Sequence, residues 1–182
     1  NHLDTSVLNG KICLNIDSEI EGVMTVGCAG GYIYDTFIPI EWSEESGTKM
    51  TLSLSGLLGG HSGGEIQKQL GNANKIMARV LYALGKEYDF NLVNINGGNA
   101  ANVIAQFNTA QIIADSSQVQ AITDAVAALE TTIIDEFAGQ EPTLSLKASV
   151  EGEATLNAFD ADTTTRVIGF LYGAIDGVQC YD

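Results

Sequence analysis

The spacing of apolar residues changes period several times between residues 50 and 150, and this alternation constrains the fold more than any other feature. Residues 50–55 alternate strictly between apolar and polar side chains, which is typical of a half-buried strand. Residues 73–84 carry apolar side chains at helical spacing, and Gly85 suits the end of that helix. The same reasoning predicts a second helix over 118–138 and strands over 88–95, 103–114 and 143–150.

The predicted order over this region is therefore strand, helix, strand, strand, helix, strand. That order is a split βαβ arrangement. We predict an α+β fold of two layers, a ferredoxin-like antiparallel sheet with helices on one face. A polar loop is expected at residues 43–47 and a last helix at about 163–174, while an apolar strand at 11–16 lies outside the unit.

Bulk composition restricts the partners of this chain. It has 182 residues, 45% of them hydrophobic, and a formal net charge of −15. Such a surface repels phosphate backbones and anionic lipid, so we expect neither nucleic acid nor membrane as a partner. The first residues do not resemble a signal peptide and suggest an internal cut through a longer chain. The three cysteines match no zinc or redox spacing, which favours buried thiols in a reducing cytosol.

A glycine-rich turn, Gly59-Gly60-His61-Ser62-Gly63-Gly64, presents one of the two histidines of the chain. It matches the G-x-S-x-G motif of serine hydrolases, but nothing downstream can serve as the histidine base of a triad. Two interpretations of His61 remain: a surface residue of the turn, or a neutral imidazole that donates a hydrogen bond to a developing oxyanion.

Asp17 stands where an apolar strand ends, at the start of Asp17-Ser18-Glu19-Ile20-Glu21-Gly22. The segment imitates half of a calcium-binding loop, yet the twelfth position is Cys28 instead of a bidentate glutamate. Asp17 is then either an acidic strand end that faces water or a carboxylate that binds a metal or substrate. One carboxylate cannot hold a metal by itself, because catalytic zinc takes three protein ligands.

Several of these segments together resemble the aminoacyl-histidine dipeptidases, the cytosolic Xaa-His or nonspecific dipeptidases of the di-zinc exopeptidases. The matching stretches span nearly the whole chain, and the run from Gly59 to Ile66 is specific. The others are Leu14 to Glu19, Gly27 to Gly31, Asn72 to Lys75, Ile95 to Gly98 with Asn102, and weakly Gly177 to Gln179.

The resemblance implies a role for three residues and a division of the chain. Asp17 is similar to a zinc-binding carboxylate, His61 to the lid histidine that contacts the substrate carbonyl, and Asn102 to a substrate-binding asparagine of the lid. Residues 1–31 are then the tail of a catalytic domain and residues 32–182 a lid, or dimerisation-type, domain.

The resemblance also implies the partners and the metal. The parent enzyme would be cytoplasmic and hold two zinc ions, and none is expected on this fragment, which would be inactive alone. Its partners would be the parent's catalytic domain, a dipeptide substrate and a second copy of the chain.

The chain departs from the family at four positions. Gln67 and Leu70 stand where a basic residue or histidine is usual, and Gln106-Phe107 replace an Arg-Glu pair. These changes indicate altered specificity or loss of activity in the parent. The competing hypotheses are a non-catalytic α+β dimerisation or interaction module and a self-contained hydrolase, which the histidine count opposes.

Overall fold

A computed structural model of the chain describes residues 6, 9–12, 14, 20–27 and 30–180. The chain divides into two compact units, Asn1–Phe37 and Ile38–Asp182. In the first unit, residues 20–27 and 30–37 form neither helix nor strand. The strand predicted at 11–16 includes residues 13, 15 and 16, which lie outside the described residues.

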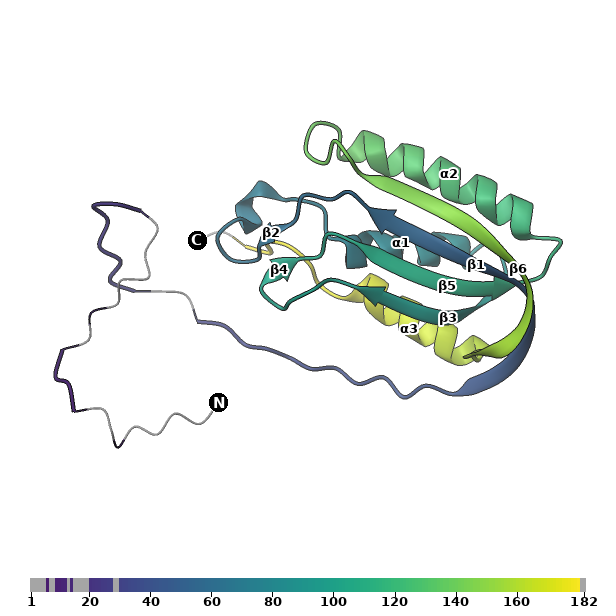
Figure 1. Ribbon diagram of the computed structural model, residues 1–182, viewed down its shortest axis with the longest axis horizontal. Helices are drawn as coiled ribbons and strands as arrows, with labels where there is room; N and C mark the ends of the chain where they lie inside the picture. Colours follow the sequence, from purple (N-terminus) through teal and green to yellow (C-terminus); the bar gives the residue numbers. More distant parts are fainter. Residues whose placement is uncertain (1–5, 7–8, 13, 15–19, 28–29, 181–182) are drawn as a thin grey trace. The chain divides into compact units, whose positions relative to one another are not determined.

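All the helices and strands named here belong to the second unit (Figure 1). In chain order they are β1 (Trp42–Ser55), β2 (Gly60–His61), the 3-10 helix η2 (Ile66–Lys68), α1 (Ala73–Leu84), β3 (Phe90–Gly97), β4 (Val103–Ile104), β5 (Asn108–Ala114), α2 (Val119–Glu136), β6 (Ser145–Phe159) and α3 (Ala161–Gly173).

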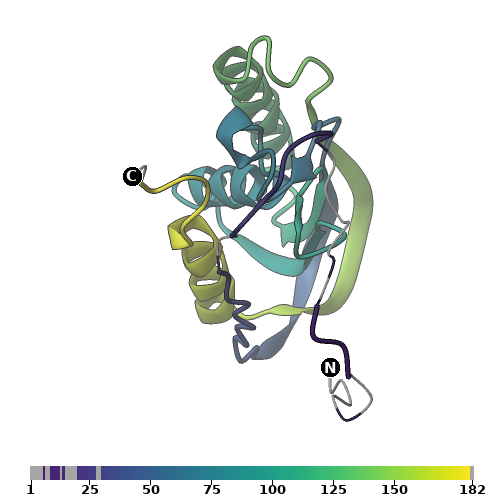
Figure 2. The ribbon, with the colours of Figure 1, turned by 90° about the vertical axis from the view of Figure 1, so that its left-hand side faces the viewer.

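Four of the strands form one antiparallel sheet in the order β3-β5-β1-β6. Strands β1 and β3 are joined through α1, and β5 and β6 through α2, so the predicted split βαβ topology is confirmed. The three helices cover one face of the sheet, with α1 between α2 and α3 (Figure 2).

The hydrophobic core lies between the sheet and these helices. On β1, Met50, Leu52 and Leu54 are at most 1% exposed and alternate with half-buried polar residues. From α1, Met77 and Leu81 are 0% exposed and meet them. Fully burying a side chain of this size contributes about 1.5–3 kcal/mol, so β1 and α1 supply much of the stability.

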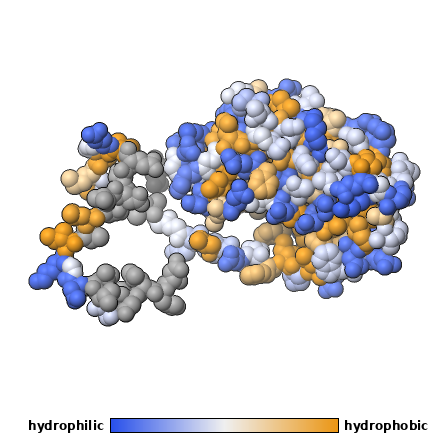
Figure 3. All heavy atoms as spheres, in the orientation of Figure 1, coloured by the Kyte–Doolittle hydropathy of each residue, from blue (hydrophilic) through white to orange (hydrophobic). Residues whose placement is uncertain are grey.

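Within the described part of Ile38–Asp182, no helix covers the other face of the sheet, which is the face turned toward the viewer in Figure 1. Figure 3 shows hydrophilic residues interspersed with hydrophobic ones across this face. Among the helices of the described chain, none has the length and apolar content to cross a bilayer.

Three predicted boundaries were wrong. The loop expected at residues 43–47 is part of β1, whose first half pairs with β6 up to Trp42 opposite Phe159. The strand expected at 143–150 continues as β6 to Phe159, because β6 pairs with the first half of β1. The strand expected at 103–114 is two strands, because Ala105–Phe107 separates β4 from β5 and β4 pairs outside the main sheet.

Helix α1 has the predicted bounds, and its first turn is fixed at both sides. The Asn72 side-chain oxygen accepts a hydrogen bond from the backbone N–H of Asn74 at 3.0 Å, a typical N-cap. The Ala73 N–H donates to the carbonyl of Ala105 at 2.8 Å. The start of α1 is therefore tied to the segment that follows β4, next to the glycine-rich turn.

Candidate functional site

Two short strands bring the predicted site residues His61 and Asn102 side by side. Strand β2 pairs with β4, with Gly60 opposite Ile104 and His61 opposite Val103. The Ser62 N–H then donates to the carbonyl of Asn102 at 3.0 Å. The side chains of His61 and Asn102 are both exposed, so the paired strands present them to the surroundings of the domain.

The two glycines before His61 have positive φ values and lie close to neighbouring side chains. Gly59 has φ +65°, and a Cβ there would lie 2.3 Å from Cγ of Gln106. Gly60 has φ +147°, and a Cβ there would lie 2.5 Å from Oε2 of Glu65. Both φ values lie in the region that favours glycine, so another residue at either position would strain the backbone of the turn.

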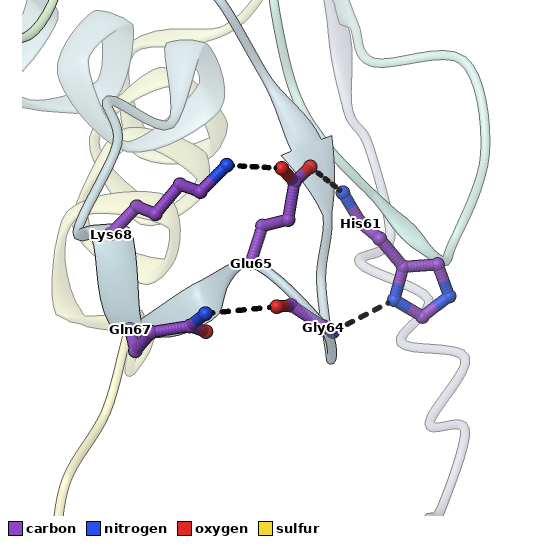
Figure 4. Close-up of polar contacts among 5 residues, drawn as sticks. All are labelled: His61, Gly64, Glu65, Gln67 and Lys68. Carbon is purple, nitrogen blue, oxygen red and sulfur yellow. Dashed lines mark hydrogen bonds and ion pairs between the residues drawn. The ribbon is translucent and has the colours of Figure 1, made fainter. Parts of the chain in front are cut away.

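The imidazole of His61 is held by the backbone that follows it. Its Nδ1 accepts hydrogen bonds from the N–H groups of Gly63 and Gly64, both at 3.0 Å. A nitrogen that accepts carries no proton, so in the neutral ring the proton is on Nε2. Figure 4 shows Nε2 turned away from the other residues drawn, and it is therefore the ring atom that can donate to a ligand.

Glu65 closes the turn from inside (Figure 4). Its carboxylate accepts from the His61 N–H at 3.1 Å and forms an ion pair with Lys68. The hydrogen bond from Lys68, then that from His61, lowers the pKa of Glu65 below its ordinary value. Gln67 also stabilises the turn, because its side-chain amide donates to the carbonyl of Gly64 at 3.0 Å.

Gln106, Phe107 and Leu70, at which the sequence is expected to depart from the family, have the following surroundings. The Gln106 side-chain amide donates to the carbonyl of Leu58 at 2.7 Å, and the Phe107 carbonyl accepts from the Gly98 N–H at 3.2 Å. Leu70 lines a cavity described below. Gln106 and Gln67 thus form hydrogen bonds that support the turn.

A cavity of about 610 Å³ adjoins the glycine-rich turn. The turn contributes Ser62 to its lining, and the segment after the turn contributes Ile66 and Leu70. Val103 of β4 and Tyr172 of α3 also line it. The segment after α3 forms a further wall and is joined to the start of α1 by the Asn72 side chain, which donates to Asp176 at 2.7 Å. The site therefore combines an exposed donor at His61 with an adjoining hollow.

Asp17 lies outside the described residues, so its predicted role as a metal ligand stays a prediction. Over the residues that the structure does describe, no three His, Cys, Asp or Glu side chains come together as a metal site would need. The described residues of this chain alone do not fit a zinc ion.

Sequence reasoning missed Glu141, which is only 4% exposed. Its carboxylate accepts from the backbone N–H groups of Leu58 at 2.7 Å and of Gly71 at 2.8 Å. Nothing in the local sequence marks it, because its partners lie 83 and 70 residues away.

Comparison with known proteins agrees with this architecture. Residues 52–141 match the family model described as the peptidase dimerisation domain, M20_dimer. The chain is 34% identical over 165 residues to the cytosol non-specific dipeptidase of Escherichia coli K12, a match that covers 88% of this chain and 34% of that protein. The chain thus spans about a third of the length of the curated relative that it matches.

A solved structure has the same fold. It is the aminoacylhistidine dipeptidase from Vibrio alginolyticus, with a TM-score of 0.72 and 23% identity. The match covers 78% of this chain and 29% of that one. Family model, sequence and fold agree, and the chain belongs to the M20 peptidase dimerisation domains.

Proposed function

We propose that the chain is the lid domain of a zinc-dependent dipeptidase that hydrolyses Xaa-His or other dipeptides. The observation that carries the proposal is the orientation of His61. Its Nδ1 accepts from two backbone N–H groups, which leaves Nε2 to donate, and the next residue, Ser62, is hydrogen-bonded to the backbone of Asn102. The names of the two relatives, a non-specific dipeptidase and an aminoacylhistidine dipeptidase, support the substrate class.

The chemistry proposed for His61 is stabilisation of an oxyanion. When water attacks the peptide carbonyl, negative charge develops on the carbonyl oxygen. A fixed N–H donor that meets this oxygen interacts more strongly with the transition state than with the substrate, and so raises kcat. Asn102, which directly precedes β4, would contact the same substrate, and Glu65 would hold the turn from which His61 projects.

The metal would be bound mainly outside the described residues. Residues 1–31 would belong to the catalytic domain, with Asp17 as one zinc ligand, and the remaining ligands and the general base would come from elsewhere in the longer protein. Two zinc ions would polarise the substrate carbonyl and activate the attacking water. The isolated chain is then expected to be inactive, and the longer protein is expected in the cytoplasm, in keeping with the name of the relative from Escherichia coli.

The test compares three substitutions of His61 in the full-length protein. His61→Ala should lower kcat about 10²–10³-fold with little change in KM, the effect of losing one oxyanion donor. His61→Asn can still accept at the position of Nδ1 but loses the donor, so it should be as slow as alanine. His61→Gln extends an amide toward the position of Nε2 and should recover part of kcat.

Asn102→Ala should also lower kcat, and its combination with His61→Ala should be less than additive if both side chains contact one substrate group. A His61→Ala protein with near-normal kcat, free of wild-type enzyme, would refute the catalytic role.

The second candidate is a dimerisation module without a catalytic role, favoured by the description of the matching family model. Both candidates expect a homodimer, which light scattering after gel filtration measures. Only the lid hypothesis expects His61→Asn to slow catalysis while the dimer mass stays unchanged.

A further inference from the structure

The segment from Leu58 to Gly71, called the histidine loop below, is bonded at both ends to one side chain. The Leu58 N–H donates to Oε2 of Glu141 at 2.7 Å, and the Gly71 N–H donates to Oε1 at 2.8 Å. Distances of this size are typical of charge-assisted hydrogen bonds, which are stronger than neutral ones. Glu141 therefore joins the start and the end of the loop that carries His61.

Glu141 and Thr143 lie in a short segment that contacts the chain just before the histidine loop, at Gly56. The Thr143 hydroxyl donates to the carbonyl of Gly56 at 2.6 Å. The backbone of Gly56 approaches Thr143 so closely that a Cβ would lie 1.9 Å from the Thr143 carbonyl oxygen. On the other side, the Leu58 carbonyl accepts from Gln106 at 2.7 Å. Both backbone groups of Leu58 are thus bonded to side chains.

Most of the histidine loop lies at the surface between two buried glycines. Each of residues 60–70 is exposed or half-buried, whereas Gly59 and Gly71 are buried and Glu141 is 4% exposed. The hydrogen bonds of His61 with Gly63, Gly64 and Glu65 are local and move with the turn. The position of the imidazole relative to the sheet therefore depends on the two ends and on the β2–β4 pair.

We propose that Glu141 is a positioning residue for His61. It would not contact the substrate. It fixes the position and orientation of the histidine loop relative to the sheet, through the backbone N–H groups of Leu58 and Gly71. The kinetic part of this inference rests on the function proposed for His61, while the structural part does not. Burying a carboxylate costs free energy, and the hydrogen bonds from Leu58 and Gly71 offset that cost. Losing either bond would therefore leave part of the cost without an offset, so both ends of the loop contribute to holding Glu141 in place.

The experiment uses the full-length protein with Glu141→Ala and Glu141→Gln. Alanine removes both acceptors. Glutamine keeps one acceptor oxygen and turns an NH2 group toward the other N–H, so it should have an intermediate effect. We expect Glu141→Ala to lower kcat about 10–100-fold, the scale on which a misplaced catalytic group slows a reaction, with KM changed much less. Hydrogen exchange of residues 58–71 should become faster while that of α1 stays slow.

Glu130 provides a matched control. Its carboxylate accepts from the Leu146 N–H at 3.0 Å and pairs with Lys147, so it too supports backbone, but at β6. Glu130→Ala should leave kcat and the exchange of residues 58–71 unchanged. In a His61→Ala background, Glu141→Ala should cause no further loss of kcat, because its effect passes through His61.

Three results would overturn the inference: unchanged exchange in the histidine loop, a uniform rise in exchange over the whole domain, or an undiminished effect of Glu141→Ala without His61. If His61→Ala itself has normal kcat, the proposed function fails instead, and faster exchange confined to the loop would still support the anchor. If Glu141→Ala does not fold, Glu141→Gln carries the same comparisons.

Discussion

The close approach of Gly56 to Thr143 makes Gly56→Ala the most informative test of how the histidine loop is attached. Gly56 has φ +81°, and its added Cβ would lie 1.9 Å from the Thr143 carbonyl oxygen and 2.7 Å from the carbonyl carbon. Both are backbone atoms, so no side-chain rotation can relieve the contact. The chain at Gly56 or Thr143 has to move.

The expected loss of stability has three parts. Placing alanine in the left-handed region costs about 1–2 kcal/mol. A shift of Gly56 weakens the hydrogen bond from the Thr143 hydroxyl, 2.6 Å long, which accounts for about 0.5–1.5 kcal/mol. It also disturbs the bond from Leu58 to the Glu141 carboxylate, 2.7 Å long, for about 1.5–3 kcal/mol. The total is about 3–6.5 kcal/mol, a large part of the stability of a typical domain.

Gly139→Ala separates these parts. Gly139 has φ +84°, nearly the same as Gly56, but nothing lies within 4 Å of its added Cβ. It should therefore lose only the conformational cost of about 1–2 kcal/mol. Urea unfolding followed by far-ultraviolet circular dichroism gives both free energies, compared at equal m values. If the two variants differ by less than about 0.5 kcal/mol, the close contact is not rigid and the reasoning fails.

Three further outcomes are expected of the same unfolding assay. Leu52→Ala should cost about 2–5 kcal/mol, because Leu52 is 0% exposed at the centre of the core. Asn72→Ala should lower the free energy of unfolding by about 1 kcal/mol and shift the transition to lower urea, since it removes the acceptor for the Asn74 N–H at the start of α1. Asp160 caps α3, and the hydrogen bond from the Thr163 N–H lowers its pKa from the ordinary 3.8. The stability that Asp160 contributes is complete above pH 3.8 and is lost as pH falls through its lower folded pKa. The difference in unfolding free energy between wild type and Asp160→Ala should therefore shrink in acid. A difference that grows in acid would contradict this sign.

The helices, and the order of helices and strands along the chain, could be predicted because they depend on local periodicity. Helix α1 has the predicted bounds, Ala73–Leu84. Residues 43–47 belong to β1, but the sequence predicted a loop there, because acidic residues and a glycine are typical of a turn. Gly47 is there for another reason: a Cβ would lie 2.5 Å from the carbonyl oxygen of Ala114 on the neighbouring strand. Pairing with β6 then extends β1 through this segment.

The candidate site was predictable residue by residue but not as an arrangement. His61 and Asn102 followed from a resemblance of short motifs, and each motif is local. Their adjacency depends on the β2–β4 pair, whose strands have two residues each and leave no periodic pattern. Glu141 was invisible for a similar reason, since hydrogen bonds between a side chain and distant backbone leave no trace in spacing.

The bulge in the β1–β6 pair has a consequence for how this long ribbon is assembled. Lys49 is opposite Gly152 and Met50 is opposite Val150, which leaves Glu151 as the extra residue. Its carboxylate binds both Lys49, at 2.8 Å, and the Thr51 hydroxyl on either side of the irregularity. A bulge offsets the alignment of the two halves of a ribbon, and a slip of one residue turns every side chain to the wrong face. Glu151 therefore favours one register of β6 against β1. In a shifted register, β6 would lose both contacts of Glu151 and would also turn its buried side chains away from the core.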